Sequence, residues 1–217
     1  MNYLISLFKE TYRGKTIART LFNWEILKHV KNIGGVVIDL GGGKNPSYER
    51  FWHIKPDKFI RVDVNEKAEP DIVADLNKPL PFDSNFADVV FLFNVIYILE
   101  NPLAVLKEIY RILKPGGRLF LTSPFIFNEA KEPADYWRLT SGALEKLLKE
   151  SGFNNFFIES VGERFSAAIY LISPFLFFWP IKFVFFCLAF LFDKLIPKKL
   201  KLKQPCPIGY FVEVIKS

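Results

Sequence analysis

Three aspartates stand at the ends of short apolar runs in the first third of the chain. Asp39 ends the run Val36-Val37-Ile38-Asp39-Leu40 and is followed by the glycines 41–43, while Asp63 and Asp75 end the next two runs. Glycine lets a backbone turn sharply and approach a ligand closely, because it has no Cβ. A carboxylate that ends the second strand of such a unit is placed to accept hydrogen bonds from ribose hydroxyls. The pattern predicts a nucleoside-binding site.

These residues need parallel strands to bring them to one edge of a sheet. Apolar runs with strand character alternate with helical patterns, such as the helix predicted from Pro102 to Leu113 with Asn101 as its N-cap. The predicted strands are 36–40, 59–63, 71–75, 87–92, 118–122, 156–161 and 210–215. We expect one α/β domain over 1–217, with a doubly wound, Rossmann-like, seven-stranded and mostly parallel sheet, and a helical cap over 1–32.

The glycine turn departs from a dinucleotide fingerprint. A G-x-G-x-x-G pattern that starts at Gly41 needs glycine where the chain has Pro46. A cofactor without a pyrophosphate does not need that helix N-terminus. The turn therefore favours S-adenosylmethionine over a nicotinamide dinucleotide.

Three segments resemble class I S-adenosylmethionine-dependent methyltransferases, in particular a methyltransferase type 11-like domain. The segment 37–43 is similar to the first motif of that family, 80–90 to the approach to its fourth strand, and 113–119 to its turn into strand five. The segments occur in the family's order and the resemblance covers residues 33–160. It implies S-adenosylmethionine as the cofactor and methyl transfer as the activity.

The resemblance also implies roles for individual residues. Gly41 and Gly43 are expected against the methionine part of the cofactor, and Asp39 is expected to hold its amino group directly or through water. Asp63 is expected at the ribose hydroxyls. The remaining cofactor contacts implied are Asp75 with the backbone of Leu76 at the adenine edge, and Asn94 at the methionine portion and the transferred methyl.

The segment 128–140 follows strand five and carries the candidates for acceptor chemistry. It resembles a signature of a methyltransferase subgroup associated with surface polysaccharides, but Ala134 stands where that pattern commonly has histidine. This departure leaves Glu129, Glu132, Asp135 and Tyr136 as weaker candidates for proton transfer, and we select Asp135, Tyr136 and Glu129 as the catalytic candidates. The alternative is structural: Asp135 and Arg138 form a local ion pair and Thr140 or Ser141 caps the next helix.

A hydrophobic helical insertion over 163–203 is predicted before the last strand. It has no charge from Phe165 to Ile181, and Pro174 and Pro180 interrupt it. A single span would separate the last strand from its sheet, and two spans need roughly 40 residues. We expect a helical hairpin on an anionic membrane surface, flanked by the lysines of 198–203. The alternatives are cover for the sheet edge or a homodimer interface.

The net charge and the numbers of cysteine and histidine residues narrow the kinds of protein that this chain can be. The net charge is +6, and the chain has two cysteines, Cys187 and Cys206, and two histidines, His29 and His53. These spacings indicate neither a disulfide framework nor a metal site, and both histidines are expected to be structural. The N-terminal segment does not read as a signal peptide. A cytoplasmic protein, peripheral on the cytoplasmic face of the membrane, is the expected location.

Two functions from different classes follow. The first is methylation of a small, glycan or lipid-linked acceptor at a membrane surface. The second is a catalytically weak protein of the same fold that serves as a peripheral membrane binding module. Nucleic acid is disfavoured as a partner, because the basic residues accompany aliphatic and Phe-rich runs instead of a polar groove.

Overall fold

A computed structural model describes residues 2–44, 46–51, 55–130 and 134–217. Its centre is a seven-stranded sheet with the strand order β3-β2-β1-β4-β5-β7-β6, in which β7 runs antiparallel to both of its neighbours. The strands are β1 Val36–Leu40, β2 Lys58–Asp63, β3 Ile72–Val73, β4 Ala87–Phe93, β5 Leu113–Pro124, β6 Asn155–Val161 and β7 Gly209–Ile215. The doubly wound, mostly parallel sheet predicted from the sequence is confirmed.

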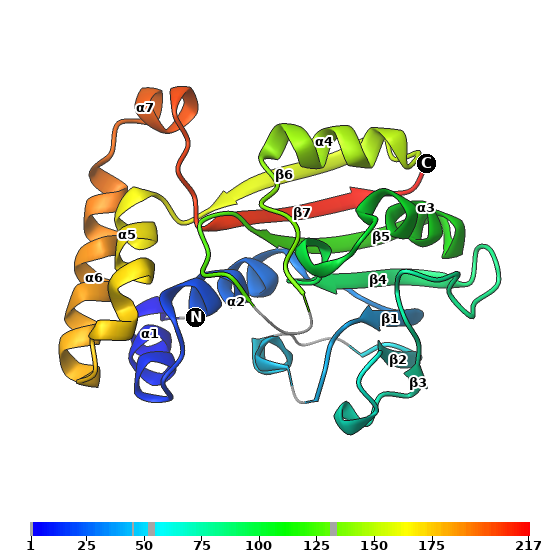
Figure 1. The fold of residues 1–217 in the computed structure, drawn as a ribbon, viewed down its shortest axis with the longest axis horizontal. Helices are drawn as coiled ribbons and strands as arrows, with labels where there is room; N and C mark the ends of the chain where they lie inside the picture. Colours follow the sequence, from blue (N-terminus) through cyan, green and yellow to red (C-terminus); the bar gives the residue numbers. More distant parts are fainter. Residues whose placement is uncertain (1, 45, 52–54, 131–133) are drawn as a thin grey trace.

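Helices cover both faces of this sheet (Figure 1). The α-helices are α1 Tyr3–Tyr12, α2 Ile17–His29, α3 Pro102–Ile112, α4 Ser141–Glu150, α5 Arg164–Ile172, α6 Trp179–Leu195 and α7 Lys198–Lys203. Short 3-10 turns are η1 Ser47–Phe51, η2 Glu66–Ala68, η3 Ile96–Ile98 and η4 Ser173–Phe175. The predicted N-terminal helical cap is two helices, because Gly14 takes φ +74° between them.

The strands alternate their side chains between two separate hydrophobic clusters. In β1, Ile38 and Leu40 pack with α3 and α4, whereas Val37 packs with α2, α5 and α6. This period of two follows from the pleat of the strand. Asp39 lies on the same side of β1 as Val37, which places its carboxylate among buried side chains.

Two predicted strands, β3 and β5, differ from the structure by more than one residue at an end. β3 has two residues, so Asp75 lies in the loop that follows instead of on the strand. β5 begins at Leu113 and not at Arg118, because Leu113 pairs with Ala87 before the register shifts. Gly116 at φ +76° accommodates this irregularity.

The predicted insertion forms α5, η4, α6 and α7 between β6 and β7. Asp193 of α6 accepts hydrogen bonds from the backbone N–H groups of Phe165 (2.8 Å) and Ser166 (3.2 Å), which ties α6 to the first turn of α5. Pro174 lies in η4 and Pro180 lies in the first turn of α6. The apolar run is therefore divided into separate helices near these two prolines, as the sequence predicted. α5 and α6 lie with α1 beyond the carboxyl ends of the parallel strands (Figure 1).

Candidate functional site

The glycine loop after β1 is held between two side chains. Gly41 takes φ +74°, and a Cβ there would lie 2.6 Å from a methyl carbon of Val95. A Cβ on Gly42 would lie 2.2 Å from Asp39 Oδ2. The Gly41 N–H donates to the Val62 carbonyl at 2.7 Å. A side chain at Gly41 or Gly42 would therefore collide with these neighbours, so the backbone path of the loop requires glycine.

Asp63 closes this loop from the end of β2. Its Oδ2 accepts the Gly43 N–H at 3.0 Å and its Oδ1 accepts the Asn65 N–H at 2.9 Å. Each carboxylate oxygen has a second lone pair. Asp63 is thus oriented by the backbone and can still accept hydrogen bonds from a ligand.

A cleft of about 810 Å³ opens beside Asp63 at the carboxyl ends of β1, β2 and β4. We call it the adenosine cleft, after the part of the cofactor expected there. Five residues predicted to bind the cofactor line it: Gly41, Asp63, Asp75, Leu76 and Asn94. Residues far apart in sequence thus converge at the carboxyl ends of the strands, where doubly wound sheets bind their ligands.

Asp75 and Leu76 differ in how they are fixed. Asp75 Oδ1 accepts hydrogen bonds from the backbone N–H of Asn77 (2.9 Å) and from its side-chain amide (3.2 Å). Leu76 is 8% exposed and packs into the core. The local Asx turn fixes the segment that follows β3 although the strand itself is short.

Asn94 stands in the left-handed region, with φ +55°, directly after β4. Its backbone N–H donates to Thr122 Oγ1 at 2.9 Å and to the Thr122 carbonyl at 3.1 Å. Its side-chain Oδ1 is buried and has no hydrogen-bond partner in the described part of the chain. A buried acceptor of this kind is expected to receive a donor from a ligand.

Asp39 lies under the glycine loop and not in the wall of the adenosine cleft. Its carboxylate is fully buried, and Tyr48 donates its phenolic O–H to Oδ2 at 2.8 Å. Burial raises the pKa of Asp39 to about 7, against the opposing effects of the Tyr48 hydrogen bond and the charge of Arg61. Oδ1 lacks a hydrogen-bond partner among the described residues.

A second cleft, of about 550 Å³, adjoins the first across Gly41 and Asn94, which line both. We call it the tyrosine cleft. Tyr48, Tyr97 and Tyr170 line it from η1, η3 and α5. Its cationic lining residues are Lys15, Arg19 and Lys44.

The tyrosine cleft is the part of the site that the sequence did not predict. Tyr170 lies inside the hydrophobic insertion, and its ring stacks on Phe127 with centroids 4.9 Å apart. Lys15 and Arg19 were not among the site residues predicted from the sequence. Lys15 lies in the turn between α1 and α2, and Arg19 lies in the first turn of α2.

The segment after β5 forms the ion pair that was the structural alternative for this region. Arg138 Nη2 donates to Asp135 Oδ2 at 2.6 Å, and the Ala130 N–H donates to the same oxygen at 2.9 Å. The Arg138 hydrogen bond lowers the pKa of Asp135. Thr140 Oγ1 accepts the Ala143 N–H at 3.2 Å and caps α4. Asp135 is therefore a weak proton acceptor.

The other catalytic candidates lie on the surface of this segment. Tyr136 lines the adenosine cleft, and its backbone N–H donates to the Tyr97 carbonyl at 2.9 Å. Ala134 lines the same cleft. Glu129 is exposed and is not among the described lining residues of either cleft. Glu132 lies outside the described residues.

His29 belongs to a charged cluster away from both clefts. Its Nε2 lies 2.9 Å from Glu159 Oε2 and 3.5 Å from Glu25 Oε2, and the three residues have the ligand types of a cation site. Lys28 Nζ lies 2.8 Å from Glu159 and 3.2 Å from Glu25. Lys28 offsets one of the two negative charges, and the ion pairs tie α2 to β6, which fits the structural role expected for His29. His53 lies outside the described residues.

Sequence comparison relates the chain to methyltransferases. Residues 39–121 match the family model described as a methyltransferase domain. A tRNA U34 carboxymethyltransferase of Campylobacter curvus is 28% identical over 111 residues, which are 45% of this chain and 37% of that protein. An uncharacterized protein of Methanocaldococcus jannaschii is 25% identical over 146 residues, which are 59% of this chain and 68% of that protein.

Solved structures show the same fold at low identity. A methyltransferase of Archaeoglobus fulgidus, described as dependent on S-adenosylmethionine, superposes with a TM-score of 0.62 at 18% identity, over 97% of this chain and 98% of its own. Phosphoethanolamine N-methyltransferase 2 of Haemonchus contortus, in complex with S-adenosylmethionine, gives 0.58 at 18% identity, over 90% of this chain and 52% of its own. The [4+2]-cyclase SpnF gives 0.56 at 19% identity, over 90% of this chain and 80% of its own.

Proposed function

We propose that this chain, a class I S-adenosylmethionine-dependent methyltransferase, transfers the methyl group to a small, glycan or lipid-linked acceptor at a membrane surface. One observation carries the proposal. The adenosine cleft and the tyrosine cleft meet at Gly41 and Asn94, and the tyrosine cleft is bounded by helices whose other side is an exposed apolar surface.

The residues of the adenosine cleft fit the cofactor. Asp63 would accept hydrogen bonds from the ribose hydroxyls, and Asp75 with the backbone of Leu76 would meet the adenine edge. The free acceptor at Asn94 Oδ1 fits an N–H donor of the methionine portion. Asp39, buried beneath Gly42, would act through water and through the shape of the loop.

Alignment is the main contribution of these residues to the reaction. S-adenosylmethionine supplies an electrophilic methyl group on a sulfonium. Transfer of that methyl group to an acceptor lone pair would break its carbon–sulfur bond and leave S-adenosylhomocysteine. Gly41 and Asn94 mark the junction at which donor and acceptor would lie in line. Tyr136 and Glu129 remain candidates for an acceptor contact, while we assign Asp135 a positioning role.

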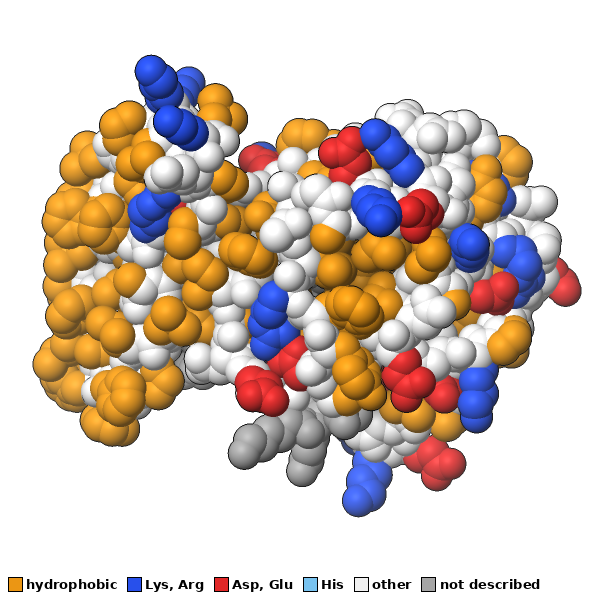
Figure 2. All heavy atoms as spheres, turned by 45° about the horizontal axis from the view of Figure 1, so that its top comes forward, with side chains coloured by type: hydrophobic (Ala, Val, Ile, Leu, Met, Phe, Trp, Pro, Cys, Tyr) orange, Lys and Arg blue, Asp and Glu red, His pale blue; other side chains and the backbone are white. Residues whose placement is uncertain are grey.

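The apolar surface lies on α1, α5, η4 and α6, and we call it the apolar platform (Figure 2). Its exposed side chains are Leu4, Ile5, Phe8, Phe165, Leu171, Ile172, Phe175, Phe177, Phe178, Ile181, Val184, Leu188, Leu191, Phe192 and Leu195. Phe177 is 90% exposed and Phe175 is 74% exposed. Exposed apolar patches of this extent mark interaction sites.

An anionic membrane fits the platform better than a second protein copy does. The lysines of α7 border the platform, and Lys198, Lys199 and Lys201 form no ion pair among the described residues. Cations beside an apolar face attract a helix pair to anionic headgroups. None of the helices in the described ranges combines the length and the apolar character needed to span a bilayer.

The platform and the tyrosine cleft share elements. α5 presents Phe165 and Leu171 outward and Tyr170 to the cleft, and α1 leads into the turn 14–16 that lines it. A bilayer on the platform would therefore bring a lipid-linked acceptor beside the cleft.

A catalytically weak binding module is the second candidate. SpnF, with the same fold, is described as a cyclase, so the fold alone does not require methyl transfer. Asp135, the buried acid after β5, is engaged with Arg138. Such a module would keep the membrane surface and lack turnover.

Three measurements test the proposal. Calorimetry with S-adenosylhomocysteine should show binding, and no binding would refute the enzyme assignment. Flotation with vesicles containing anionic lipid should carry the protein upward, and the combined F175S, F177S and F178S change should abolish this. V73S, at an exposed position of β3, is the matched control. Transfer of labelled methyl to extracted lipids and glycans then separates the enzyme from the binding module.

A further inference from the structure

We propose that the tyrosine cleft binds a phosphate group carried by the methyl acceptor. This inference rests on the proposed function, because it names the chemistry of the acceptor that the same site would take.

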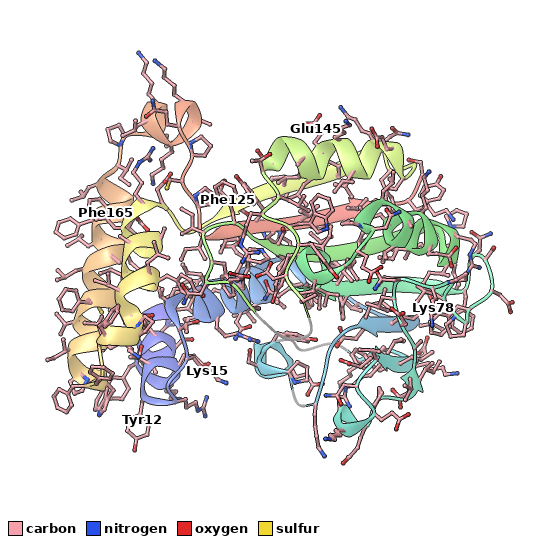
Figure 3. The ribbon with its side chains drawn as sticks, in the orientation of Figure 1. Tyr12, Lys15, Lys78, Phe125, Glu145 and Phe165 are labelled. Atoms are coloured by element: carbon pink, nitrogen blue, oxygen red, sulfur yellow. The ribbon has the colours of Figure 1, made fainter. Side chains whose placement is uncertain are left out.

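Two cations of this cleft have no carboxylate partner in the described part of the chain. Lys15 precedes α2 and Arg19 lies in its first turn, and neither forms an ion pair among the described residues. Figure 3 shows Lys15 between α1 and η1. A third cation, Lys44, pairs with Glu69. The described lining of the cleft contains neither aspartate nor glutamate, so its charge is positive.

Arg19 faces the interior of the cleft. Its Nη1 donates to Ser47 Oγ at 3.4 Å, a long bond that leaves most of its donors free. Burial raises the pKa of Tyr97 and of Tyr170, and the charge of Arg19 opposes the rise at both. Arg19 thus lines the same cleft as Tyr97 of η3 and Tyr170 of α5.

Phosphate matches this set of donors better than a carboxylate does. A phosphate monoester carries close to two negative charges at neutral pH and has three acceptor oxygens. Arg19 offers a planar fork of donors, and Lys15 adds a point charge. The N-terminus of α2, capped by Thr16, contributes a partial positive charge on the same side.

The size and place of the cleft fit a headgroup. Its volume of about 550 Å³ lies within the usual range for small-molecule pockets. It reaches from Gly41 and Asn94, at the methyl-transfer junction, to Tyr170 of α5. A phosphate near Arg19 would leave the rest of the acceptor between these two ends.

The experiment uses the full chain and glycerol 3-phosphate as the probe. Binding is measured by calorimetry with and without saturating S-adenosylhomocysteine. We expect R19Q to weaken binding of the probe at least tenfold and K15Q to weaken it less, with S-adenosylhomocysteine affinity unchanged in both. K107Q, on the exposed face of α3, is the control and should bind as the wild type does.

A second arm identifies the source of the phosphate. Vesicles with phosphatidic acid are compared with vesicles of equal charge that contain phosphatidylserine. Stronger binding to phosphatidic acid that is lost in R19Q supports a lipid phosphate, and binding of the soluble probe supports a free phosphate ester.

The failures are distinguishable. If R19Q loses S-adenosylhomocysteine affinity instead, the cations hold the cofactor carboxylate and the proposal is wrong. Unchanged affinity of R19Q for the probe and for phosphatidic acid also overturns it, as does a wild type that binds neither. Failure of the wild type to bind S-adenosylhomocysteine refutes the proposed function itself.

Discussion

Tyr48 of η1 donates its phenolic O–H to Asp39 Oδ2 at 2.8 Å, beneath the glycine loop. Both side chains are buried, and the contact joins the end of β1 to the turn that follows the loop. The same Asp39 oxygen would lie 2.2 Å from a Cβ on Gly42. The loop is thus supported from below by a hydrogen bond to a buried carboxylate.

Tyr48→Phe should destabilise the protein in a pH-dependent way. A hydrogen bond to a charged group contributes about 1.5–3 kcal/mol, more than one to a neutral group. The loss in unfolding free energy should therefore be larger at pH 8, where Asp39 is ionised, than at pH 6. Urea unfolding at both pH values measures it. An equal loss at both would show that the ionisation of Asp39 is not coupled to Tyr48.

Asp39→Asn should flatten the pH dependence of stability around neutrality. Because burial raises the pKa of Asp39 to about 7, the folded protein holds a proton that the unfolded chain releases near 3.8. The stabilising contribution is complete below pH 3.8 and is lost as the pH rises through about 7. Each unit of pKa elevation corresponds to about 1.4 kcal/mol. The melting temperature from pH 5 to 8 should fall less in Asp39→Asn than in the wild type.

Gly42→Ala should distort the loop and weaken cofactor binding. The new methyl group would meet the Asp39 carboxylate, and overpacking typically costs about 1–3 kcal/mol. Gly142→Ala is the control. Its Cβ would have one neighbour within 4 Å, Thr140 Oγ1 at 4.0 Å, and alanine is favoured over glycine in a helix such as α4. Thermal melts and S-adenosylhomocysteine titration should separate the two variants, and equal affinities would count against a rigid loop.

Asp63→Ala should weaken S-adenosylhomocysteine binding about tenfold to a hundredfold. The change removes an acceptor for the ribose hydroxyls and the support of the Gly43 N–H, and bonds to a charged group are worth about 1.5–3 kcal/mol. Asp57→Asn alters an exposed residue at the opposite end of β2 and should leave the affinity unchanged. Calorimetry on both variants decides the ribose assignment.

Asp135→Asn should lower activity without changing the shape of the pH–rate profile. The ion pair with Arg138 holds the segment that follows β5, and its loss should reduce stability by about 1–3 kcal/mol. A general base at this position would instead make the rate of the wild type, but not of the variant, rise with pH through its pKa. Loss of a pH-dependent limb in Asp135→Asn would restore Asp135 as the base.

The sequence predicted which residues gather at the carboxyl ends of the strands, because its signals are local, and their role in binding the cofactor stays a prediction. A glycine turn after one strand and acidic residues at the ends of parallel strands lie at the same edge of a sheet. The residues predicted from this pattern that line one cleft are Gly41, Asp63, Asp75, Leu76 and Asn94. The strand ends were less certain. Asp75 was assigned to a strand that stops at Val73, because an Asx turn competes with strand pairing there.

The direction of the Asp39 side chain is a feature that the sequence left open. Its place at the end of β1 follows from the sequence, but the direction of its side chain depends on which face of the sheet is covered. Because α2, α5 and α6 cover that face, the carboxylate is buried against Tyr48 instead of lining a cleft.

By itself the sequence determined the order of the main features along the chain. These are a glycine turn, spaced acidic residues and a doubly wound sheet with a hydrophobic helical insertion. These follow from local periodicity and backbone preference. Only the tertiary structure decided that Lys15, Arg19 and Tyr170 meet at one cleft, and that Asp135 is engaged with Arg138. The contacts at the cleft depend on how α1, α2 and α5 pack beyond the strand ends, which residue spacing along the chain does not encode. The Asp135–Arg138 ion pair was one of two interpretations that the sequence left open.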